Sequence, residues 1–250
     1  VQVAVAIQVA QNSTRRRIAR PRCLQQPDVE HAGAVRGLGD KGPDFGVKAI
    51  EGVAGVYGNS RKGNLLEDLD AGASRAPAVV EGRTRASLKI QDGCDGKCSY
   101  CIVPTVRGKG VSRSSREIID EAKALIDYDI PEIVLTGITI GSYNFEGDDL
   151  ASLAEKIVSL EGDFRLRITS VEPMHITDRL AALFLHPKIC QHIHLPLQSG
   201  SDRILSIMNR PYSRAEFLER VAKIRAVNPD ISIGSDVIVA FPGETDENFS

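Results

Sequence analysis

Residues 86–101 read ASLKIQDGCDGKCSYC, and this stretch decides the fold. A β-rich run leads directly into Cys94, Cys98 and Cys101, which have a C-x3-C-x2-C spacing. Cysteine thiolates hold iron–sulfur clusters, and a [4Fe–4S] cubane has one iron more than three cysteines can ligate. An iron without a protein ligand is a position where a cofactor or substrate can bind. The alternative is a structural zinc site completed by a distant His, although no His has the short spacing typical of zinc modules.

Beyond Ala86, segments typical of strands alternate along the chain with segments typical of helices. β-rich runs predict strands at 86–90, 132–138, 165–171, 189–195 and 231–239. Amphipathic helices are predicted between them: one after a capping-box spacing at Ser114 and Glu117, one at 149–160, and one after Ser213 and Glu216. Repeated βα units require parallel strands with right-handed crossovers. We therefore predict an α/β fold, a partial (βα) TIM-like barrel with its ligands at the C-terminal strand ends.

The N-terminal part has a different character. Residues 1–10 (VQVAVAIQVA) alternate as a half-buried strand does, but residues 12–55 hold no sustained period. Five arginines between Arg15 and Arg22 suit either a phosphate contact or a solvated face. We predict a remnant of a small, degraded α/β N-terminal domain at 1–70, a linker at 71–85 and a core at 86–250 that stops before its last βα unit.

Composition limits where and how the protein acts. The 250 residues carry 31 basic and 33 acidic side chains, a net charge of -2, so any contact with nucleic acid must be local. No apolar stretch approaches the roughly 18 to 20 residues that cross a bilayer, which predicts a cytoplasmic protein without a membrane partner. Three of five cysteines lie within eight residues, a pattern typical of metal binding and unlike a disulfide framework, so we expect no disulfides.

Five segments carry a family resemblance. In chain order they are IQDGCDGKCSYCIVPTVRGKGVSR, EIVLTGITIGSY, RLRITSVEP, HIHLPLQSGSDRILSIMNRPYS and SDVIVAFPGET. Together, over Ala86 to Phe249, they resemble the methylthiotransferases of the radical S-adenosylmethionine (SAM) superfamily. IQDGCD, LTGITIGSY and SVEP most resemble the enzymes that convert threonylcarbamoyladenosine in tRNA to its 2-methylthio form. The sister enzymes for isopentenyladenosine in tRNA, or for an aspartate of a ribosomal protein, are weaker matches.

The resemblance implies a mechanism and a set of site residues. Cys94, Cys98 and Cys101 would hold a [4Fe–4S] cluster whose open iron is chelated by SAM, and one-electron reduction would yield a 5′-deoxyadenosyl radical. The implied partners are the tRNA anticodon loop and an electron donor such as flavodoxin or ferredoxin. No catalytic side chain is assigned. The positions expected to bind SAM stand at predicted strand ends or on residues 93–101, which hold the three cysteines and are called the cysteine loop below. They are Tyr100, Thr136, Gly137, Glu172, Gln198, Ser199 and Asp236.

The chain departs from the family pattern in two places. The family's N-terminal domain holds a second, sulfur-carrying [4Fe–4S] cluster on three cysteines, and here only Cys23 precedes Cys94. GVAGVYGNSRKGNLLEDL resembles the end of that domain, but the ligands of its cluster are missing. Ala240 stands before FPGET where the family usually has Gly, which adds a methyl group near the expected adenine pocket. A catalytically silent metal-binding module is therefore the alternative of another class.

Overall fold

The computed structural model describes residues 5–8, 53–57 and 83–249 of the chain. Two compact units divide it, Val1–Arg75 and Ala76–Ser250. In the first unit, strand β1 (Val5–Gln8) pairs antiparallel with β2 (Val53–Tyr57). The arginines between Arg15 and Arg22, Cys23 and most of the predicted linker lie outside the described residues.

The second unit contains the repeated βα pattern. Its elements are β3 (Arg85–Lys89), β4 (Gln91–Asp92), α2 (Val103–Arg107), β5 (Val111–Ser112), α3 (Ser115–Asp127), β6 (Glu132–Thr136), the 3₁₀ turn η3 (Ile140–Ser142), β7 (Asn144–Phe145), β8 (Asp148–Asp149), α4 (Leu150–Val158), β9 (Arg165–Ile168), η4 (Pro173–His175), α5 (Asp178–Ala182), η5 (Leu183–Leu185), β10 (His192–His194), α6 (Asp202–Ile207), α7 (Arg214–Val227), β11 (Ser232–Gly234) and α8 (Asp246–Phe249).

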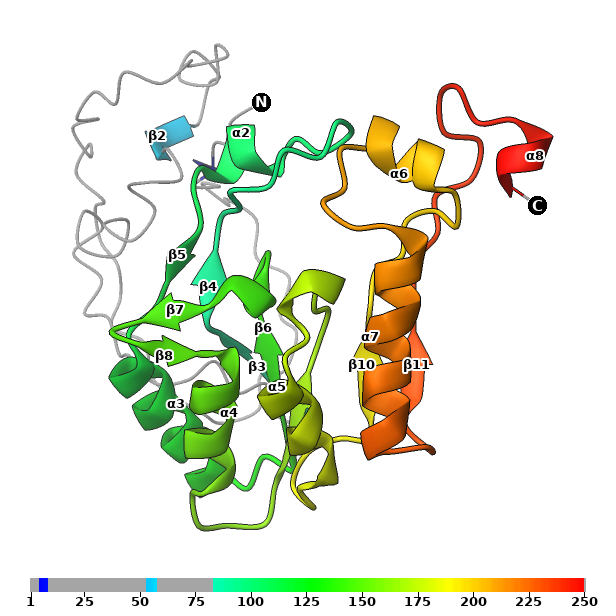
Figure 1. The fold of residues 1–250 in the computed structure, drawn as a ribbon. Helices are drawn as coiled ribbons and strands as arrows, with labels where there is room; N and C mark the ends of the chain where they lie inside the picture. Colours follow the sequence, from blue (N-terminus) through cyan, green and yellow to red (C-terminus); the bar gives the residue numbers. More distant parts are fainter. Residues whose placement is uncertain (1–4, 9–52, 58–82, 250) are drawn as a thin grey trace, which may run out of the picture. The chain divides into compact units, whose positions relative to one another are not determined.

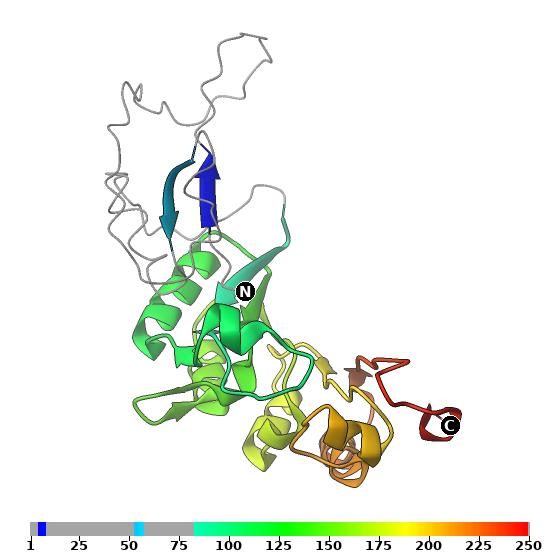
Figure 2. The same cartoon turned by 90° about the horizontal axis from the view of Figure 1, so that it is seen from above.

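Five parallel strands form an open row. β3, β6 and β9 make one parallel sheet, and β10 and β11 make a parallel pair. Parallel bridges from Leu166 to Ile189 and from Ser170 to His194 connect the two groups along the chain's order. Helices α3, α4, α5 and α7 lie along one face of the row (Figures 1 and 2). The predicted partial (βα) barrel is confirmed, and its strands place their C-terminal ends at the same edge.

The core forms because apolar residues recur along each strand and helix at the spacing that places them on one face of that element. On β6, Ile133 and Leu135 are fully buried, and on α3 the apolar positions Ile118, Ala122 and Leu125 face the same core. The buried side chains are almost entirely aliphatic, as parallel sheets covered by helices require. The predicted apolar stripe of the first helix is therefore confirmed.

The two predicted capping boxes have different outcomes. Ser213 accepts a hydrogen bond from the Glu216 N–H while the Glu216 side chain accepts from the Ser213 N–H, so α7 begins with a complete capping box. Ser114 is the N-cap of α3, but its side chain makes no capping hydrogen bond. That capping box was a wrong prediction, because the spacing alone does not turn the hydroxyl toward the free N–H groups.

Several strands end earlier than their apolar runs. β6 ends at Thr136, β10 covers only His192–His194, and β11 covers only Ser232–Gly234. Beyond β11, Gln198 and Val237 form one isolated parallel bridge, and Val237 and Val239 are exposed. The apolar runs therefore overestimate the strand lengths, because the hydrogen-bonded pairing between neighbouring strands stops before the apolar residues do.

One buried carboxylate stands at the opposite end of the strands from the cysteine loop. Glu132, the first residue of β6, is 2% exposed. Arg167 donates to it at 2.6 Å, while Arg85 and Arg165 approach at 2.9 and 3.2 Å. Hydrogen bonding from Arg167 and the other arginine charges outweigh burial and lower the pKa of Glu132.

Ala240 has a backbone conformation that L-residues disfavour. Its φ is +56°, a left-handed value that costs a non-glycine residue roughly 1–2 kcal/mol. We expect Ala240→Gly to stabilise the loop before α8 locally by about 0.5–1 kcal/mol and to slow its amide hydrogen exchange. The control Ala222→Gly, at an exposed interior position of α7, should lower stability by about 1 kcal/mol. Unchanged or faster exchange in Ala240→Gly would contradict this interpretation of the loop.

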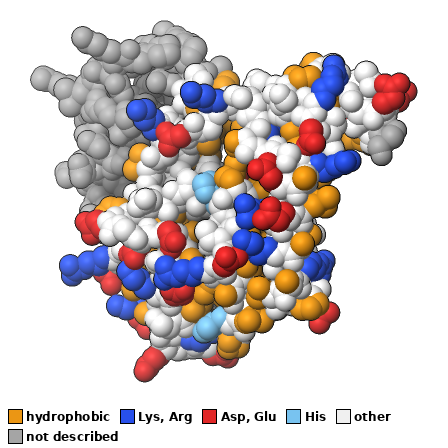
Figure 3. Space-filling model, in the orientation of Figure 1, with side chains coloured by type: hydrophobic (Ala, Val, Ile, Leu, Met, Phe, Trp, Pro, Cys, Tyr) orange, Lys and Arg blue, Asp and Glu red, His pale blue; other side chains and the backbone are white. Residues whose placement is uncertain are grey.

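The surface of the second unit carries both signs of charge. On the face in Figure 3, basic and acidic side chains are interspersed and form no large basic field. This agrees with the net charge of -2 and limits electrostatic contact to local groups. In the described part of the chain, no helix has the length and apolar character needed to cross a bilayer.

Candidate metal centre and cofactor cavity

The cysteine loop begins at a fixed point of the barrel. Gln91 is buried, and its Oε1 accepts hydrogen bonds from the N–H groups of Ile138 and Thr139 at 3.0 and 2.9 Å. Its Nε2 donates to the Gly93 carbonyl at 2.7 Å. One side chain therefore joins the start of the loop to the segment that follows β6. Gly93 has φ +73°, and a Cβ there would lie 2.0 Å from the Lys109 carbonyl oxygen, so only glycine fits.

A second segment, distant in sequence, holds the middle of the loop. We call Ile207–Arg210, at the end of α6, the clamp segment. Ser99 donates through its N–H to the Met208 carbonyl at 3.0 Å and through its hydroxyl to the Ile207 carbonyl at 2.8 Å. Asn209 Nδ2 donates to the Lys97 carbonyl at 2.7 Å. Both ends of the loop's central turn are thus fixed by residues about one hundred positions later in the chain.

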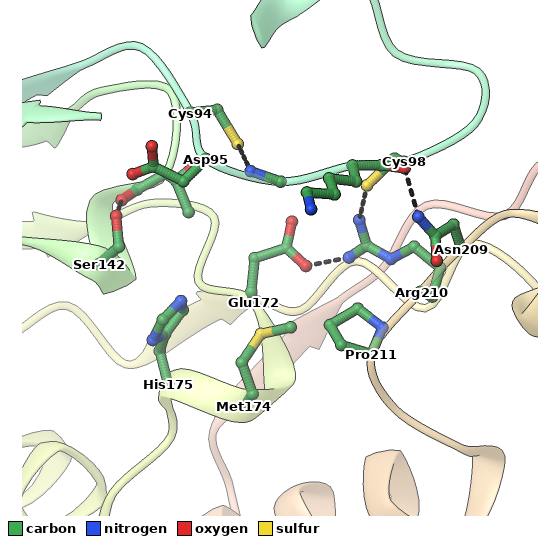
Figure 4. A pocket seen from close by; sticks show the side chains of 13 residues that line it. Cys94, Asp95, Cys98, Ser142, Glu172, Met174, His175, Asn209, Arg210 and Pro211 are labelled. Atoms are coloured by element: carbon green, nitrogen blue, oxygen red, sulfur yellow. Dashed lines mark hydrogen bonds and ion pairs between the residues drawn. The ribbon is translucent and has the colours of Figure 1, made fainter. Parts of the chain in front are cut away.

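A cavity of about 450 Å³ lies beneath the cysteine loop (Figure 4). The cavity is surrounded by the cysteine loop, η3 with the residue before it, η4 with its N-cap Glu172, and the clamp segment with Pro211. Its lining residues are Cys94, Asp95, Gly96, Lys97, Cys98, Thr139, Ser142, Glu172, Met174, His175, Asn209, Arg210 and Pro211. The cavity stands at the C-terminal ends of the strands, where the barrel fold places ligand sites.

An ion pair between the buried Arg210 side chain and the partly exposed Glu172 carboxylate lines this cavity. Arg210 is 5% exposed, and its guanidinium pairs with the Glu172 carboxylate and donates through Nη1 to Cys98 Sγ at 3.1 Å. The guanidinium also lies 5.0 Å from the Tyr212 ring centre and donates through Nε to Tyr212 Oη at 3.1 Å. Burial opposes the charge of Arg210, but Glu172, Tyr212 and Cys98 outweigh it, so its pKa is raised and the side chain stays cationic. Burial is also the largest cause that raises the pKa of Tyr212, to about 12.

His175 gives the cavity a neutral polar wall. Burial lowers its pKa below the ordinary value of 6.5, so the imidazole is neutral near pH 7. Its side chain also fills the space beside η3, where a Cβ on Gly141 would lie 2.7 Å from His175 Cβ. A neutral imidazole can both donate and accept hydrogen bonds.

The three cysteines have the chemistry of a cluster site. Cys94, Cys98 and Cys101 are free thiols in partly or fully exposed positions. Cys94 and Cys98 line the cavity, and their sulfurs lie 3.1 and 3.9 Å from the point where a Gly96 Cβ would stand. Cys101 lies outside the cavity lining. Among residues 83–249, no three His, Cys, Asp or Glu side chains converge closely enough to hold a single metal ion. Three free cysteine thiols on one short loop are the type of donor that iron–sulfur clusters use.

Of the seven predicted cofactor positions, one lines the cavity and six do not. Glu172 lies in it, and Tyr100 packs edge-to-face on Phe241 with ring centres 6.0 Å apart. Thr136 and Gly137 end and follow β6, and a Cβ on Gly137 would lie 2.8 Å from Ile140 Cγ2 and 3.0 Å from the Gln91 carbonyl oxygen. The close approach that this glycine permits is therefore to the Ile140 side chain and to Gln91 of the protein itself.

The remaining three predicted positions lie on the β10–β11 side. Ser199 is 1% exposed, and its hydroxyl accepts from the Ser201 N–H at 3.2 Å. Gln198 has φ +68° and pairs by backbone with the segment after β11. Asp236 is exposed and reaches His194 Nε2 at 3.3 Å, while His194 Nδ1 lies 2.8 Å from Ser170 Oγ. Gln198 and Asp236 are joined by a backbone hydrogen bond next to β10, and none of the three residues lines the cavity.

The cavity also contains functional candidates that the sequence did not single out. Asn209 and Arg210 belong to the MNRPYS part of a quoted segment, and Met174 and His175 directly follow SVEP. A polar Asn-Arg pair directly after a helix is the only sequence signal that could have marked the clamp segment. Arg210 lies 112 positions after Cys98 in the sequence, so the sequence does not reveal the contact between them.

Comparison with known proteins identifies the superfamily of this chain and several similar enzymes. Residues 88–250 match the Radical SAM superfamily. The threonylcarbamoyladenosine tRNA methylthiotransferase of Chlamydia pneumoniae is 37% identical over 249 residues, which cover 98% of this chain and 59% of that enzyme. The enzyme of the same name from Bacillus subtilis is 42% identical over 207 residues, 80% of this chain and 43% of its own. A tRNA-2-methylthio-N(6)-dimethylallyladenosine synthase of Geobacter sulfurreducens is 46% identical over 173 residues, 68% of this chain and 39% of its own.

Solved structures agree at the level of the fold. The radical SAM methyltransferase TsrM from Kitasatospora setae, with cobalamin and a [4Fe–4S] cluster bound, superposes with a TM-score of 0.53 at 19% identity, over 65% of this chain and 32% of its own. The cobalamin-dependent radical SAM enzyme OxsB gives a TM-score of 0.51 at 13% identity, over 61% of this chain and 23% of its own. The chain spans about 59% or less of the length of the methylthiotransferases named above. The chain belongs to the radical SAM superfamily, and over up to 98% of its length it is similar to enzymes named as tRNA methylthiotransferases.

Proposed function

We propose that this chain is the radical SAM part of an enzyme that adds a methylthio group to C2 of N6-threonylcarbamoyladenosine next to the anticodon in tRNA. The observation that carries the proposal is the 37% identity that extends over 98% of the chain to an enzyme named for that substrate. The free cysteines beside a cavity at the strand ends supply a site for the chemistry. A tRNA substrate implies a cytoplasmic location, and the reaction implies an electron donor such as flavodoxin or ferredoxin.

In this proposal, Cys94, Cys98 and Cys101 hold a [4Fe–4S] cluster, and SAM occupies the cavity beneath them. These residues would hold a cluster that, once reduced by the electron donor, would supply the electron for cleavage of SAM to methionine and a 5′-deoxyadenosyl radical. Glu172 and Arg210 present opposite charges to the cavity, which suits the amino and carboxylate groups of SAM. Tyr100, on the cysteine loop but outside the cavity lining, packs on Phe241, and this aromatic pair suits an adenine ring that extends out of the cavity. The second cluster expected for the family has no three-cysteine ligand set in this sequence.

A second substrate deserves a direct comparison because the Geobacter synthase, named for dimethylallyladenosine, is 46% identical over 173 residues. The full chain, reconstituted anaerobically with iron and sulfide, is incubated with SAM as the source of the methyl group and of the radical, dithionite as the reductant, added sulfide as the source of the sulfur atom, and tRNA carrying either modified adenosine. Mass spectrometry of the digested nucleosides then identifies the product. We expect the 2-methylthio product only from the threonylcarbamoyl tRNA. A product only from the dimethylallyl tRNA would replace our proposal with the second one.

A silent metal-binding module is the alternative of another class. It predicts a bound metal but no 5′-deoxyadenosine, with either tRNA. If 5′-deoxyadenosine forms but neither tRNA is methylthiolated, the radical site works and the sulfur insertion attributed to this chain is wrong. The two measurements therefore separate the cofactor chemistry from the substrate assignment.

A further inference from the structure

Arg210 connects the cysteine loop to the barrel through three contacts. Its Nη1 donates to Cys98 Sγ at 3.1 Å, its Nη2 pairs with Glu172 directly before η4, and its Nε donates to Tyr212 Oη. Tyr212 in turn donates to the Pro196 carbonyl at 2.8 Å, just beyond β10. With 5% of its side chain exposed, Arg210 has little freedom to leave Cys98. The sulfur therefore has a fixed cationic donor.

A donor at this sulfur has an electrostatic consequence. A cluster gains negative charge when it is reduced, and hydrogen bonds to its ligand sulfurs are among the groups that set its reduction potential. A cation that donates to a thiolate stabilises the more negative, reduced form and so raises the potential. Two features make the effect of Arg210 on the sulfur strong. The Arg210 side chain is poorly solvated, and a charge-assisted hydrogen bond is about twice as strong as a neutral one.

Glu172 acts in the opposite direction. Its carboxylate pairs with the same guanidinium and lines the same cavity, and its side chain is only 25% exposed. It cancels part of the positive charge that Arg210 presents to Cys98. The two side chains therefore form a unit whose members have opposite effects on the charge near the sulfur.

We propose that Arg210 is a positioning residue that raises the reduction potential of the cluster held by Cys94, Cys98 and Cys101, and that Glu172 limits this increase. The inference rests on the cluster site of the proposed function and adds to it a residue that controls the electron-transfer step. It predicts opposite shifts for the two substitutions. Loss of the cation lowers the potential, and loss of the anion raises it.

The test is a redox titration of the reconstituted full chain without SAM, followed by electron paramagnetic resonance of the reduced cluster. Arg210→Met should shift the midpoint to a more negative potential, and Glu172→Gln should shift it to a less negative one. Arg210→Lys keeps the charge but not the fork of N–H donors, so its shift should have the sign of Arg210→Met and be smaller. Iron and sulfide per chain are measured for every variant.

Two controls separate this effect from loss of structure. Arg179→Met removes an arginine that pairs with Glu155 on the helical face and touches no cysteine, so the potential should not change. Arg203→Met removes an arginine that donates to the Gly243 carbonyl and to Asn248 Oδ1 and lies outside the cavity lining, so it too should leave the midpoint unchanged.

The outcomes distinguish the inference from the function on which it rests. If the wild-type chain takes up no iron, the cluster site of the proposed function is wrong. If the wild type and the variants are loaded with iron and share one midpoint, the role of Arg210 is wrong and the cluster site stands. Should Arg210→Met fail to fold or to bind iron, Arg210→Lys and Glu172→Gln still decide the question through the sign of their shifts.

Discussion

Cys98→Ala is expected to abolish formation of 5′-deoxyadenosine from SAM and to remove most of the bound iron. The reason is that a cubane loses one of only three protein ligands, and the remaining two cysteines leave two irons without a thiolate. We expect the rate to fall by more than about 100-fold, because even hydrogen-bond partners of metal ligands typically contribute 10- to 100-fold. The measurements are iron per chain after anaerobic reconstitution and 5′-deoxyadenosine after addition of dithionite.

Cys190→Ala is the matched control for this experiment. Cys190 is also a free thiol, but it is 5% exposed and its Sγ donates to Glu132 at 3.7 Å, away from the cavity. This variant should keep the iron content and the cofactor cleavage of the wild type. Equal iron and equal product in Cys98→Ala and wild type would contradict the metal site. Loss of both in Cys190→Ala would show that the assay reports folding rather than ligation.

Glu132→Gln is expected to destabilise the folded chain by about 3 kcal/mol. The carboxylate is 2% exposed and accepts from Arg167, and removal of one partner from a buried ion pair typically costs about 3–5 kcal/mol because a charge is left uncompensated. We take the lower end because Arg85 and Arg165 are largely exposed. Urea unfolding at pH 7 measures the difference. Glu155→Gln, at an exposed pair with Arg179, should change stability by less than about 1 kcal/mol.

The same residue predicts a pH dependence. The pKa of Glu132 is lowered in the folded state from its ordinary value of 4.5, chiefly by the hydrogen bond from Arg167. A lowered folded pKa means that the stabilisation is complete above pH 4.5 and is lost as the pH falls through the lower folded pKa. The wild type should therefore lose its advantage over Glu132→Gln at acidic pH. A stability difference that stays constant from pH 7 down to pH 3 would contradict the role of this carboxylate.

The sequence predicted the features that depend on the spacing of residues close together in the chain. Strand positions, the apolar faces of α3 and α4 and the capping box of Ser213 follow from residues a few positions apart. The position of the site at the strand ends follows from parallel topology, which the repeated βα pattern already implies. Cys94, Cys98 and Glu172, which line the cavity, were therefore among the predicted residues.

The rest of the site depends on contacts that no local pattern encodes. Arg210 reaches Cys98 only because the clamp segment returns to the cysteine loop after α6. Ser199 and Gln198 stand at a strand end as predicted, yet a buried hydroxyl and a backbone pairing turn them away from the cavity. The direction of a side chain at a strand end depends on how each loop leaves the sheet, and the alternation of the strand no longer applies there.

The central claim is that the loop containing Cys94, Cys98 and Cys101 holds a cluster that cleaves SAM. The most direct measurement is iron and sulfide per chain after anaerobic reconstitution, together with 5′-deoxyadenosine formed from SAM on reduction with dithionite. The account predicts about four irons per chain, as in one [4Fe–4S] cluster, and formation of 5′-deoxyadenosine that Cys98→Ala abolishes. Bound zinc without cofactor cleavage would contradict it and would make the cysteine loop a structural metal site.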